Sequence, residues 1–420
     1  MPNSAESSKR FYVFETTSYN FSVNISSGLA NALALRVLNF DVFEIGLLTS
    51  TRIFSYALSQ LPGVFFPDSV RRNRKLIWNI GGAVNRIGLS LSILSVFTTH
   101  PLSFQYLLGL TAVTQFAGGL AGVAAGDLLG DLVSLEEAPS FWSRINKLIY
   151  ISTILSLLTG SLIFLTVRNL LEAYILVYSL ALASALFSTV MLLMIKDPGP
   201  SDLNGLSKIG YSRNKVHSRI SVVSFTNDTY KYLALQLLFN YSVNLPAPFW
   251  DYLVLNVLGG NEIIILVKNM SGLLAKFFSI EFWKKNLLEK GSNNTLSLGM
   301  ASTSLVPVAY IVAPSAWMTI LAEAYSGFAW SSLDLTNAIY TFYLTPSEQR
   351  PAYISVLSLS TNLIASLASF TGSLIAGITG SIYPPFIISS IMRVASSGIT
   401  HKLAPEINHN RGMGVRGKLP

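Results

Sequence analysis

Twelve long apolar segments constrain the fold of this 420-residue chain more than any other feature. Two examples are LIWNIGGAVNRIGLSLSILSVF and LIYISTILSLLTGSLIFLTV, and a helix needs about 20 such residues to cross a bilayer. Only 12% of the residues are charged, whereas soluble domains average about 25%. The sequence therefore predicts an all-α membrane protein with twelve transmembrane helices, near 18–39, 42–66, 75–98, 102–127, 145–167, 171–195, 229–257, 261–283, 295–313, 315–343, 352–379 and 381–400.

The net charge of +8 follows the expected topology. Lys and Arg concentrate in the loops 67–75, 196–228 and 284–291 and in both terminal stretches, and we assign Arg393 to the same side. Lys and Arg accumulate in cytoplasmic loops, so we expect a multi-pass protein of the cell membrane with both termini cytoplasmic. The basic excess then marks topology and gives no reason to expect a nucleic-acid partner.

A repeated phrase indicates that the chain is built from two related halves. NFSVN at 20–24 returns as NYSVN at 240–244, and TGSL at 159–162 returns at 371–374. Matches in the same order continue between these points, with offsets of 220 to 212. Parallel six-helix halves occur in transporters, which bind substrate near the midplane between them. We predict pseudo-two-fold symmetry and these parts: tail 1–17, half 18–195, linker 196–228, half 229–400 and tail 401–420, with both tails and the linker cytoplasmic.

Two stretches resemble the major facilitator superfamily, over roughly residues 18–400. GVFFPDSVRRNRK is similar to the family's signature between the second and third helices, although Gly63 and Asp68 are one residue too far apart. GFAWSSLDLTNAIYTFYLTPSEQRPAYISV resembles the family's tenth and eleventh helices with their loop. The fourth helix has no arginine, unlike typical proton-antiporting drug exporters of the family. The resemblance implies a gating loop with Asp68 and Arg72, and a second-half counterpart at Glu289.

The resemblance also implies that the first, fourth, seventh and tenth helices line a central cavity. Asn20, Asn24 and Asn31 share one face of the first helix, and Asn244 and Asp251 repeat part of this pattern in the seventh. The alternative is that these amides bond to neighbouring helices. The candidate cavity residues are Asn24, Asn31, Gln115, Asn244, Asp251, Glu323 and Trp330.

Charged residues inside the spans are costly and therefore informative. Asp251 and Lys268 each lie about 12 Å along their helices from the turn at Gly259–Gly260, at 1.5 Å per residue. We predict that they form an ion pair. Arg52, Lys268 and Asp334 are the candidates for charge pairing or ion coupling, with interhelical salt bridges unrelated to substrate as the alternative.

Two further patterns in the fourth helix have structural interpretations. Glycines recur every fourth residue from Gly118 to Gly130, which predicts a close packing seam. Asp127 and Asp131 are spaced to hold Mg²⁺ with a diphosphate, as in membrane prenyl transferases, or to pair with the arginines near residue 72. The chain has no cysteine and its four histidines are scattered, so we expect no metal site and no cofactor.

We expect a protein that is not an enzyme: a secondary active or facilitated transporter of a small polar or amphoteric solute, working by alternating access. Its partners would be the solute, the lipid bilayer and a proton or sodium ion, with the protein as a monomer. The alternatives are a membrane-embedded prenyl or lipid transferase using Asp127 and Asp131, and a non-transporting receptor on the same fold.

Overall fold

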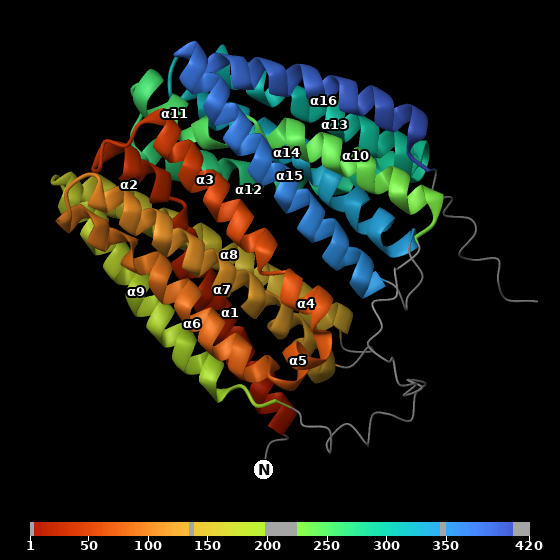
Figure 1. The fold of residues 1–420 in the computed structure, drawn as a ribbon, viewed down its shortest axis with the longest axis horizontal. Coiled ribbons are helices and arrows are strands. Elements are labelled where there is room, and N and C mark those ends of the chain that lie inside the picture. Colours follow the sequence, from red (N-terminus) through yellow and green to blue (C-terminus); the bar gives the residue numbers. More distant parts are fainter. Residues whose placement is uncertain (1–3, 134–137, 198–224, 345–349, 406–420) are drawn as a thin grey trace, which may run out of the picture. The chain divides into compact units, whose positions relative to one another are not determined.

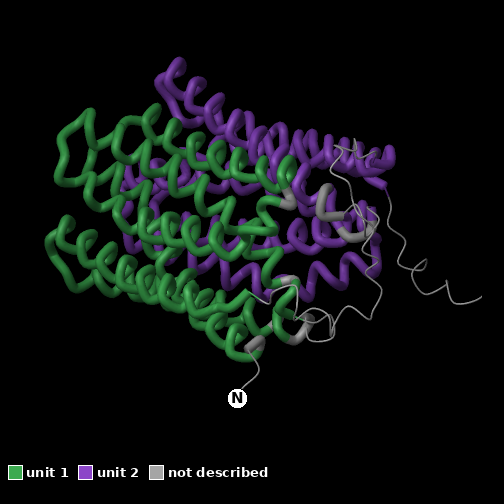
Figure 2. Tube along the Cα trace, turned by 60° about the horizontal axis from the view of Figure 1, so that its bottom comes forward, with its two compact units in different colours: residues 1–222 green, residues 223–420 purple. Residues whose placement is uncertain are grey.

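The computed structural model describes residues 4–133, 138–197, 225–344 and 350–405, and all regular elements in these ranges are helices (Figure 1). The chain divides into two compact units, residues 1–222 and 223–420 (Figure 2). The boundary between them falls inside the predicted linker 196–228, most of which lies outside the described residues.

The first unit contains six spanning segments, several of them built from two consecutive helices. A short helix, α5 (Pro67–Arg72), lies between the second and third of these segments. The segments are α1 (Ser4–Ser27) with α2 (Ala30–Arg36), α3 (Val42–Leu58) with α4 (Leu61–Phe65), α6 (Arg74–Ser90) with the 3₁₀ helix η1 (Leu91–Phe97), α7 (Leu102–Leu132), α8 (Ala138–Thr166) and α9 (Leu170–Met194).

The second unit repeats this plan, with its first segment the most irregular. That segment consists of α10 (Asn227–Asn244), the 3₁₀ turn η3 (Ala247–Phe249), α11 (Trp250–Tyr252) and the π-helical turn η4 (Leu253–Val257). The other five are α12 (Glu262–Lys290), α13 (Ser292–Ile311), α14 (Met318–Tyr343), α15 (Arg350–Thr379) and α16 (Tyr383–Leu403). Each of the twelve predicted spans thus corresponds to a helical segment.

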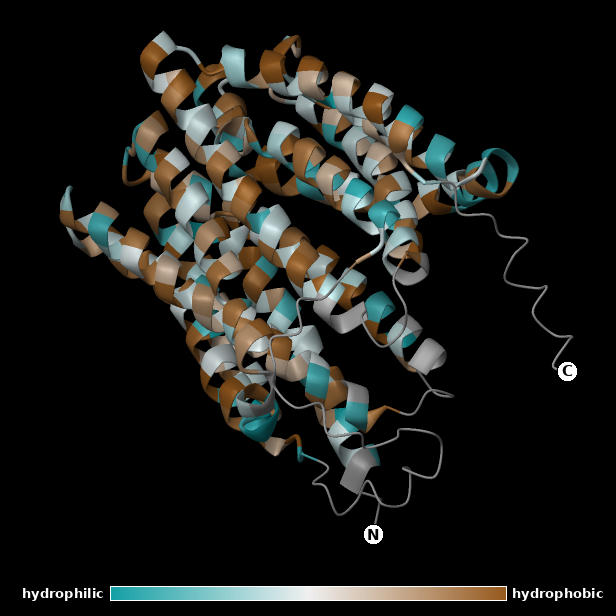
Figure 3. Ribbon diagram, turned by 45° about the vertical axis from the view of Figure 1, so that its right-hand side comes forward, coloured by the Kyte–Doolittle hydropathy of each residue, from teal (hydrophilic) through white to brown (hydrophobic). Residues whose placement is uncertain are grey.

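The surface of the helices is suited to lipid. Within the described ranges, six helices are long and apolar enough to cross a membrane on length and composition alone. Large hydrophobic side chains are exposed along the helices, including Phe278 at 75% and Ile378 at 84%. Figure 3 shows hydrophobic residues along the length of the helices. Contiguous apolar exposure of this kind is unfavourable in water and favourable in a bilayer.

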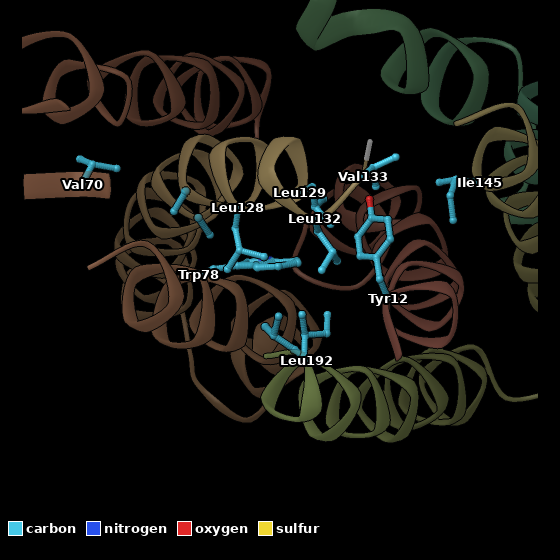
Figure 4. Packing of buried hydrophobic residues seen from close by; sticks show 12 residues of the cluster. Tyr12, Val70, Trp78, Leu128, Leu129, Leu132, Val133, Ile145 and Leu192 are labelled. Carbon is cyan, nitrogen blue, oxygen red and sulfur yellow. The ribbon is translucent and has the colours of Figure 1, made fainter. Parts of the chain in front are cut away.

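Aromatic and aliphatic side chains form the core of the first unit. Trp78 of α6 lies against Leu128 and Leu192, and Tyr12 of α1 packs edge-on against the Trp78 ring at 6.1 Å (Figure 4). These contacts tie α1, α6, α7 and α9 together at one end of the unit. Helix α1 begins at Ser4, so it includes most of the stretch predicted as the tail 1–17, and Tyr12 of that stretch is part of this core.

The glycine seam predicted along α7 is present only in part. A Cβ atom on Gly118 would lie 2.4 Å from the Asn85 side chain, so this glycine does permit close packing of α6 on α7. Gly122 and Gly126 would meet nothing within 4 Å, so the seam prediction is wrong for them. In the second unit a close glycine contact joins α12 and α14, where a Cβ on Gly327 would come 2.0 Å from the Gly272 carbonyl oxygen.

Candidate functional site

A cluster of four polar side chains lies within the second unit. The Lys268 ammonium of α12 lies 3.2 Å from the Asp251 carboxylate of α11, and both side chains are largely buried, at 5% and 16% exposed. This confirms the predicted ion pair. Lys268 also interacts electrostatically with Glu323 of α14. The Tyr310 hydroxyl of α13 donates a hydrogen bond to Glu323, which completes the cluster.

The helices carry these groups at specific irregularities. Asp251 follows an interruption of the seventh spanning segment, and the π-helical turn 253–257 comes directly after it. Such turns are frequent at functional sites. Glu323 faces the point of closest approach between α12 and α14, since a Cβ on Gly272 would lie 3.1 Å from the Glu323 side chain. Small residues there allow Lys268 and Glu323 to share one site.

A second buried charge pair lies within the first unit. Arg86 of α6 contacts the Glu15 carboxylate at 2.8 Å, and the two side chains are 2% and 5% exposed. The guanidinium also donates to the Gly82 carbonyl at 2.9 Å and to the Ser188 hydroxyl, and it stacks over the Tyr19 ring at 4.9 Å. Ser188 in turn donates to the Glu15 carbonyl at 2.9 Å. The pair thus joins α1, α6 and α9.

The repeated asparagines have a local role that the sequence did not show. Asn24 donates to the carbonyl of Asn20 at 2.7 Å, and Asn244 donates to the carbonyl of Asn240 at 2.8 Å. Each amide therefore bonds to the backbone four residues earlier in its own helix. Asn24 also reaches across to the Thr153 hydroxyl of α8 at 3.1 Å. Of these three bonds, the one from Asn24 to Thr153 agrees with the alternative in which the amides bond to neighbouring helices.

The other predicted cavity and charge residues lie on several helices in each of the two units. Asn31, Arg52 and Gln115 are half-buried on α2, α3 and α7 of the first unit. Trp330 packs against Phe239 in the core of the second unit, with ring centroids 6.1 Å apart. Asp334 pairs with Lys276 at 2.5 Å, with side chains 53% and 32% exposed.

The two aspartates at the end of α7 are held by arginines. Arg74, whose side chain is only 6% exposed, contacts Asp127 at 2.9 Å, Asp131 at 2.5 Å and Asp197 at 2.7 Å. Arg71 contacts Asp131 at 3.2 Å. Of the two interpretations offered by the sequence, the geometry agrees with structural pairing, because both carboxylates already bind guanidinium groups.

The residues assigned to the gating loop make few described contacts. The side chain of Asp68 lies outside the described side chains. Arg72 is exposed at the end of α5, and Glu289 lies 3.8 Å from Lys285 one turn earlier in α12.

Sequence reasoning missed two buried charges. Glu15 falls in the polar stretch 1–17, which lies before the first apolar segment and was therefore not searched for buried charges. Its position directly ahead of a span was a usable signal. Arg393 was assigned to the cytoplasmic surface, and this is wrong: it lies in the middle of α16 with 2% exposure. Its guanidinium donates to the carbonyls of Thr303 at 2.8 Å and Val243 at 3.3 Å.

Taken with the twelve helical segments and the lipid-compatible surface, these features define a multi-pass membrane protein of two six-helix units. Comparison with solved structures then assigns the fold. The chain resembles a D-xylose–proton symporter (TM-score 0.72, 13% identity, 96% of this chain and 99% of that chain) and the inward-open xylose transporter XylE from E. coli (TM-score 0.69, 12% identity, 96% and 97%). It also resembles the nucleoside transporter NupG (TM-score 0.66, 12% identity, 96% and 99%).

XylE is described as a major facilitator superfamily protein, and this chain therefore has the major facilitator superfamily fold over nearly its whole length. The sequence resemblance to that family is confirmed at the level of the fold. No protein-family model matches the sequence, and no curated protein matches it.

Proposed function

We propose that this protein is a secondary transporter that moves a small polar or amphoteric solute across the cell membrane by alternating access, with a proton as the coupling ion. The observation that carries the proposal is the cluster of Asp251, Lys268, Tyr310 and Glu323 inside one membrane unit. Ionisable residues within spans are expensive and typically mark solute or proton pathways. The fold is shared with proteins described as a proton symporter and a nucleoside transporter.

The charges of the cluster support both the kind of solute and the coupling ion. Two carboxylates and one ammonium leave one formal negative charge among these groups. Within the described part of the chain, no cationic side chain lies within 4.0 Å of Glu323. A proton on Glu323, or the amino group of an amphoteric solute, would neutralise the excess. We infer that proton and solute binding are linked through this carboxylate.

An enzyme built on Asp127 and Asp131 is not favoured. A diphosphate–Mg²⁺ site needs free carboxylate oxygens, and here Arg71 and Arg74 contact both aspartates. Among the described residues there is also no group of three or more side chains suited to hold a metal ion.

Replacing Glu323 with glutamine should uncouple transport from the proton gradient. In proteoliposomes, a gradient of one pH unit stores about 1.4 kcal/mol per proton, enough for about tenfold accumulation of a neutral solute at one-to-one coupling. The wild-type protein should accumulate solute under this gradient, whereas E323Q should exchange solute at equilibrium without accumulating it. The solute is first found by thermal-shift screening of small polar compounds, because binding to the folded state raises stability.

The matched control for this experiment is Glu281→Gln. Glu281 belongs to the pair with Lys284 on α12, and its side chain is 78% exposed. E281Q should behave like the wild type. Accumulation by E323Q at the wild-type level would contradict the role of Glu323, and the absence of any solute-dependent stabilisation or flux would favour a receptor over a transporter.

We further propose that both termini and the basic loops are cytoplasmic, which a labelling experiment can test. The protein has no native cysteine, and Ser69 is exposed in α5. The S69C protein should react with a membrane-impermeant thiol reagent only after the cells are permeabilised, because the positive-inside rule puts Arg71 and Arg72 on the cytoplasmic side. Labelling of intact cells would reverse the proposed orientation.

A further inference from the structure

The interruption of the seventh spanning segment begins with two prolines. Pro246 and Pro248 have no backbone N–H, so the carbonyls of Ser242 and Asn244 cannot receive their usual helical hydrogen bonds from four residues later. Helix α10 accordingly ends at Asn244, and a 3₁₀ turn follows. Carbonyls left at a helix end inside a membrane protein need other donors, since lipid offers none.

Helices α15 and α16 meet three successive carbonyls at this point. The Ser369 hydroxyl donates to the Asn244 carbonyl at 3.1 Å, and the Arg393 guanidinium donates to the Val243 carbonyl at 3.3 Å. The Leu245 carbonyl lies directly against Gly372, where a Cβ atom would come within 1.9 Å of its oxygen. The end of α10 is thus held from two neighbouring helices.

Arg393 also connects this helix end to a site in α13 where a proline removes a helical hydrogen bond. Its other terminal nitrogen donates to the Thr303 carbonyl at 2.8 Å, and that carbonyl also lacks its usual donor because Pro307 stands four residues later in α13. The planar guanidinium presents several donors in a fixed fork, so one side chain can serve both carbonyls. Its positive charge also lies at the negative end of α10, which is the favourable placement for a cation.

Arg393 is a buried charge without a nearby carboxylate in the described part of the chain. The residue is 2% exposed, its Nε atom has no hydrogen-bond partner, and no carboxylate in the described ranges lies within 4.0 Å of it. A buried charge of this kind is costly and is usually retained for a specific function.

The same helix also contacts the chain beyond the interruption. Phe386 of α16, which is fully buried, packs edge-on against Trp250 with ring centroids 4.7 Å apart. Trp250 directly precedes Asp251, and its ring also meets Tyr310 of the polar cluster at 4.7 Å. Helix α16 therefore contacts the segment on both sides of the break, through Arg393 before it and Phe386 after it.

The first unit has an equivalent arrangement made by a different residue. There α1 ends at Ser27, and the Tyr178 hydroxyl of α9 donates to the Ser26 carbonyl at 3.0 Å. In both units the sixth spanning helix supplies a fully buried donor to the carbonyls where the first is interrupted.

We propose that Arg393 and Ser369 are positioning residues: they hold the interruption between α10 and α11 in the shape that sets Asp251 beside Lys268. This inference rests on the proposed function for its transport consequence only. Its structural consequence, a locally loosened segment 249–257 when the donors are weakened, can be measured whether or not a solute is known.

The test uses Arg393→Lys and Ser369→Ala in the full-length protein. Lysine keeps the charge but loses the fork, and alanine removes one donor. Both variants should raise hydrogen–deuterium exchange of the amides in 249–257 at least about tenfold, while exchange in α12 and α13 stays at the wild-type level. In proteoliposomes, KM should rise more than kcat falls, because Asp251 is misplaced while the remaining machinery is intact.

The controls are Ser373→Ala on α15 and Ser396→Ala on α16. Each serine is buried, and its hydroxyl donates only within its own helix, to the carbonyls of Ser369 at 2.9 Å and Met392 at 2.7 Å. Both controls should leave exchange in 249–257 unchanged.

The proposal would be overturned by unchanged exchange in 249–257 in both R393K and S369A, by an increase spread evenly over the second unit, or by an equal increase in S373A. A local increase in exchange with an unchanged KM would also contradict the positioning of Asp251. If the wild-type protein transports no solute, the proposed function fails, and the exchange data alone decide the structural inference.

Discussion

Replacing Lys268 with methionine is expected to destabilise the protein by about 3–5 kcal/mol and to abolish solute uptake. The substitution removes the ammonium group that lies 3.2 Å from the Asp251 carboxylate, and this carboxylate stays largely buried. Removing one partner of a buried ion pair carries a cost of this size. Asp251→Asn should also destabilise the protein, because it strands the Lys268 charge. The midpoint of chemical or thermal unfolding in detergent measures both effects.

The double variant D251N/K268M separates packing from function. Removing both charges should restore much of the stability lost in either single variant, since neither Asp251 nor Lys268 is then left as a buried charge without its partner. Uptake should stay absent if Asp251 meets the solute or the proton. If the two destabilising effects simply add, the side chains do not interact; if uptake also returns, the site lies elsewhere and Glu323 becomes the leading candidate.

A matched control lies on the same two helices as Lys268 and Glu323. Lys276 of α12 pairs with Asp334 of α14 at 2.5 Å, but its side chain is 32% exposed and that of Asp334 is 53% exposed. Partly hydrated pairs contribute at most about 1 kcal/mol. K276M should therefore lower stability much less than K268M, although the chemical change is the same.

The second large effect is expected at Arg86. Arg86→Met removes the 2.8 Å contact with Glu15, the bond to Ser188 and the stacking on Tyr19 in one step. We expect a loss of about 3–5 kcal/mol, because Glu15 is then buried without a cation. The contribution of the guanidinium to this stability can be checked independently with Gly82→Ala. The added Cβ atom would lie 2.8 Å from the Arg86 guanidinium and displace it.

The double variant Glu15→Leu with Arg86→Leu is the decisive comparison. Buried ion pairs can often be replaced by hydrophobic side chains with little loss, or even a gain, in stability. We therefore expect the double variant to be more stable than R86M. A double variant as unstable as R86M would show that the hydrogen bonds of the guanidinium, and not its charge pairing, hold α1, α6 and α9 together.

Two features of this protein could be read from the sequence alone: the class of fold and one contact of the candidate site. The length of an apolar segment can be read without knowing which helices pack beside it, because any helix that crosses the bilayer needs about 20 apolar residues. Each predicted span accordingly corresponds to a helical segment. The Asp251–Lys268 pair was also predictable. Two opposite charges at equal depth on consecutive antiparallel helices have few other ways to be satisfied.

The directions in which the remaining polar side chains point became visible only in the folded structure. The asparagine phrase on α1 and α10 indicated a polar face, but side-chain amides can bond to their own helix, and here Asn24 and Asn244 do so. Gly122 and Gly126 had the spacing of a packing seam, and no neighbour occupies it.

Arg393 and Glu15 show the physical limit most clearly. A window of 20 residues averages hydrophobicity and identifies a span, but it does not identify the partner of a charge within or beside that span. Arg393 bonds to the carbonyls of Thr303 and Val243, 90 and 150 residues away, which lie near prolines in two other spanning segments, and Glu15 of α1 meets Arg86 of α6. Such pairings depend on the rotation and contacts of each helix, and these exist only once the unit has packed.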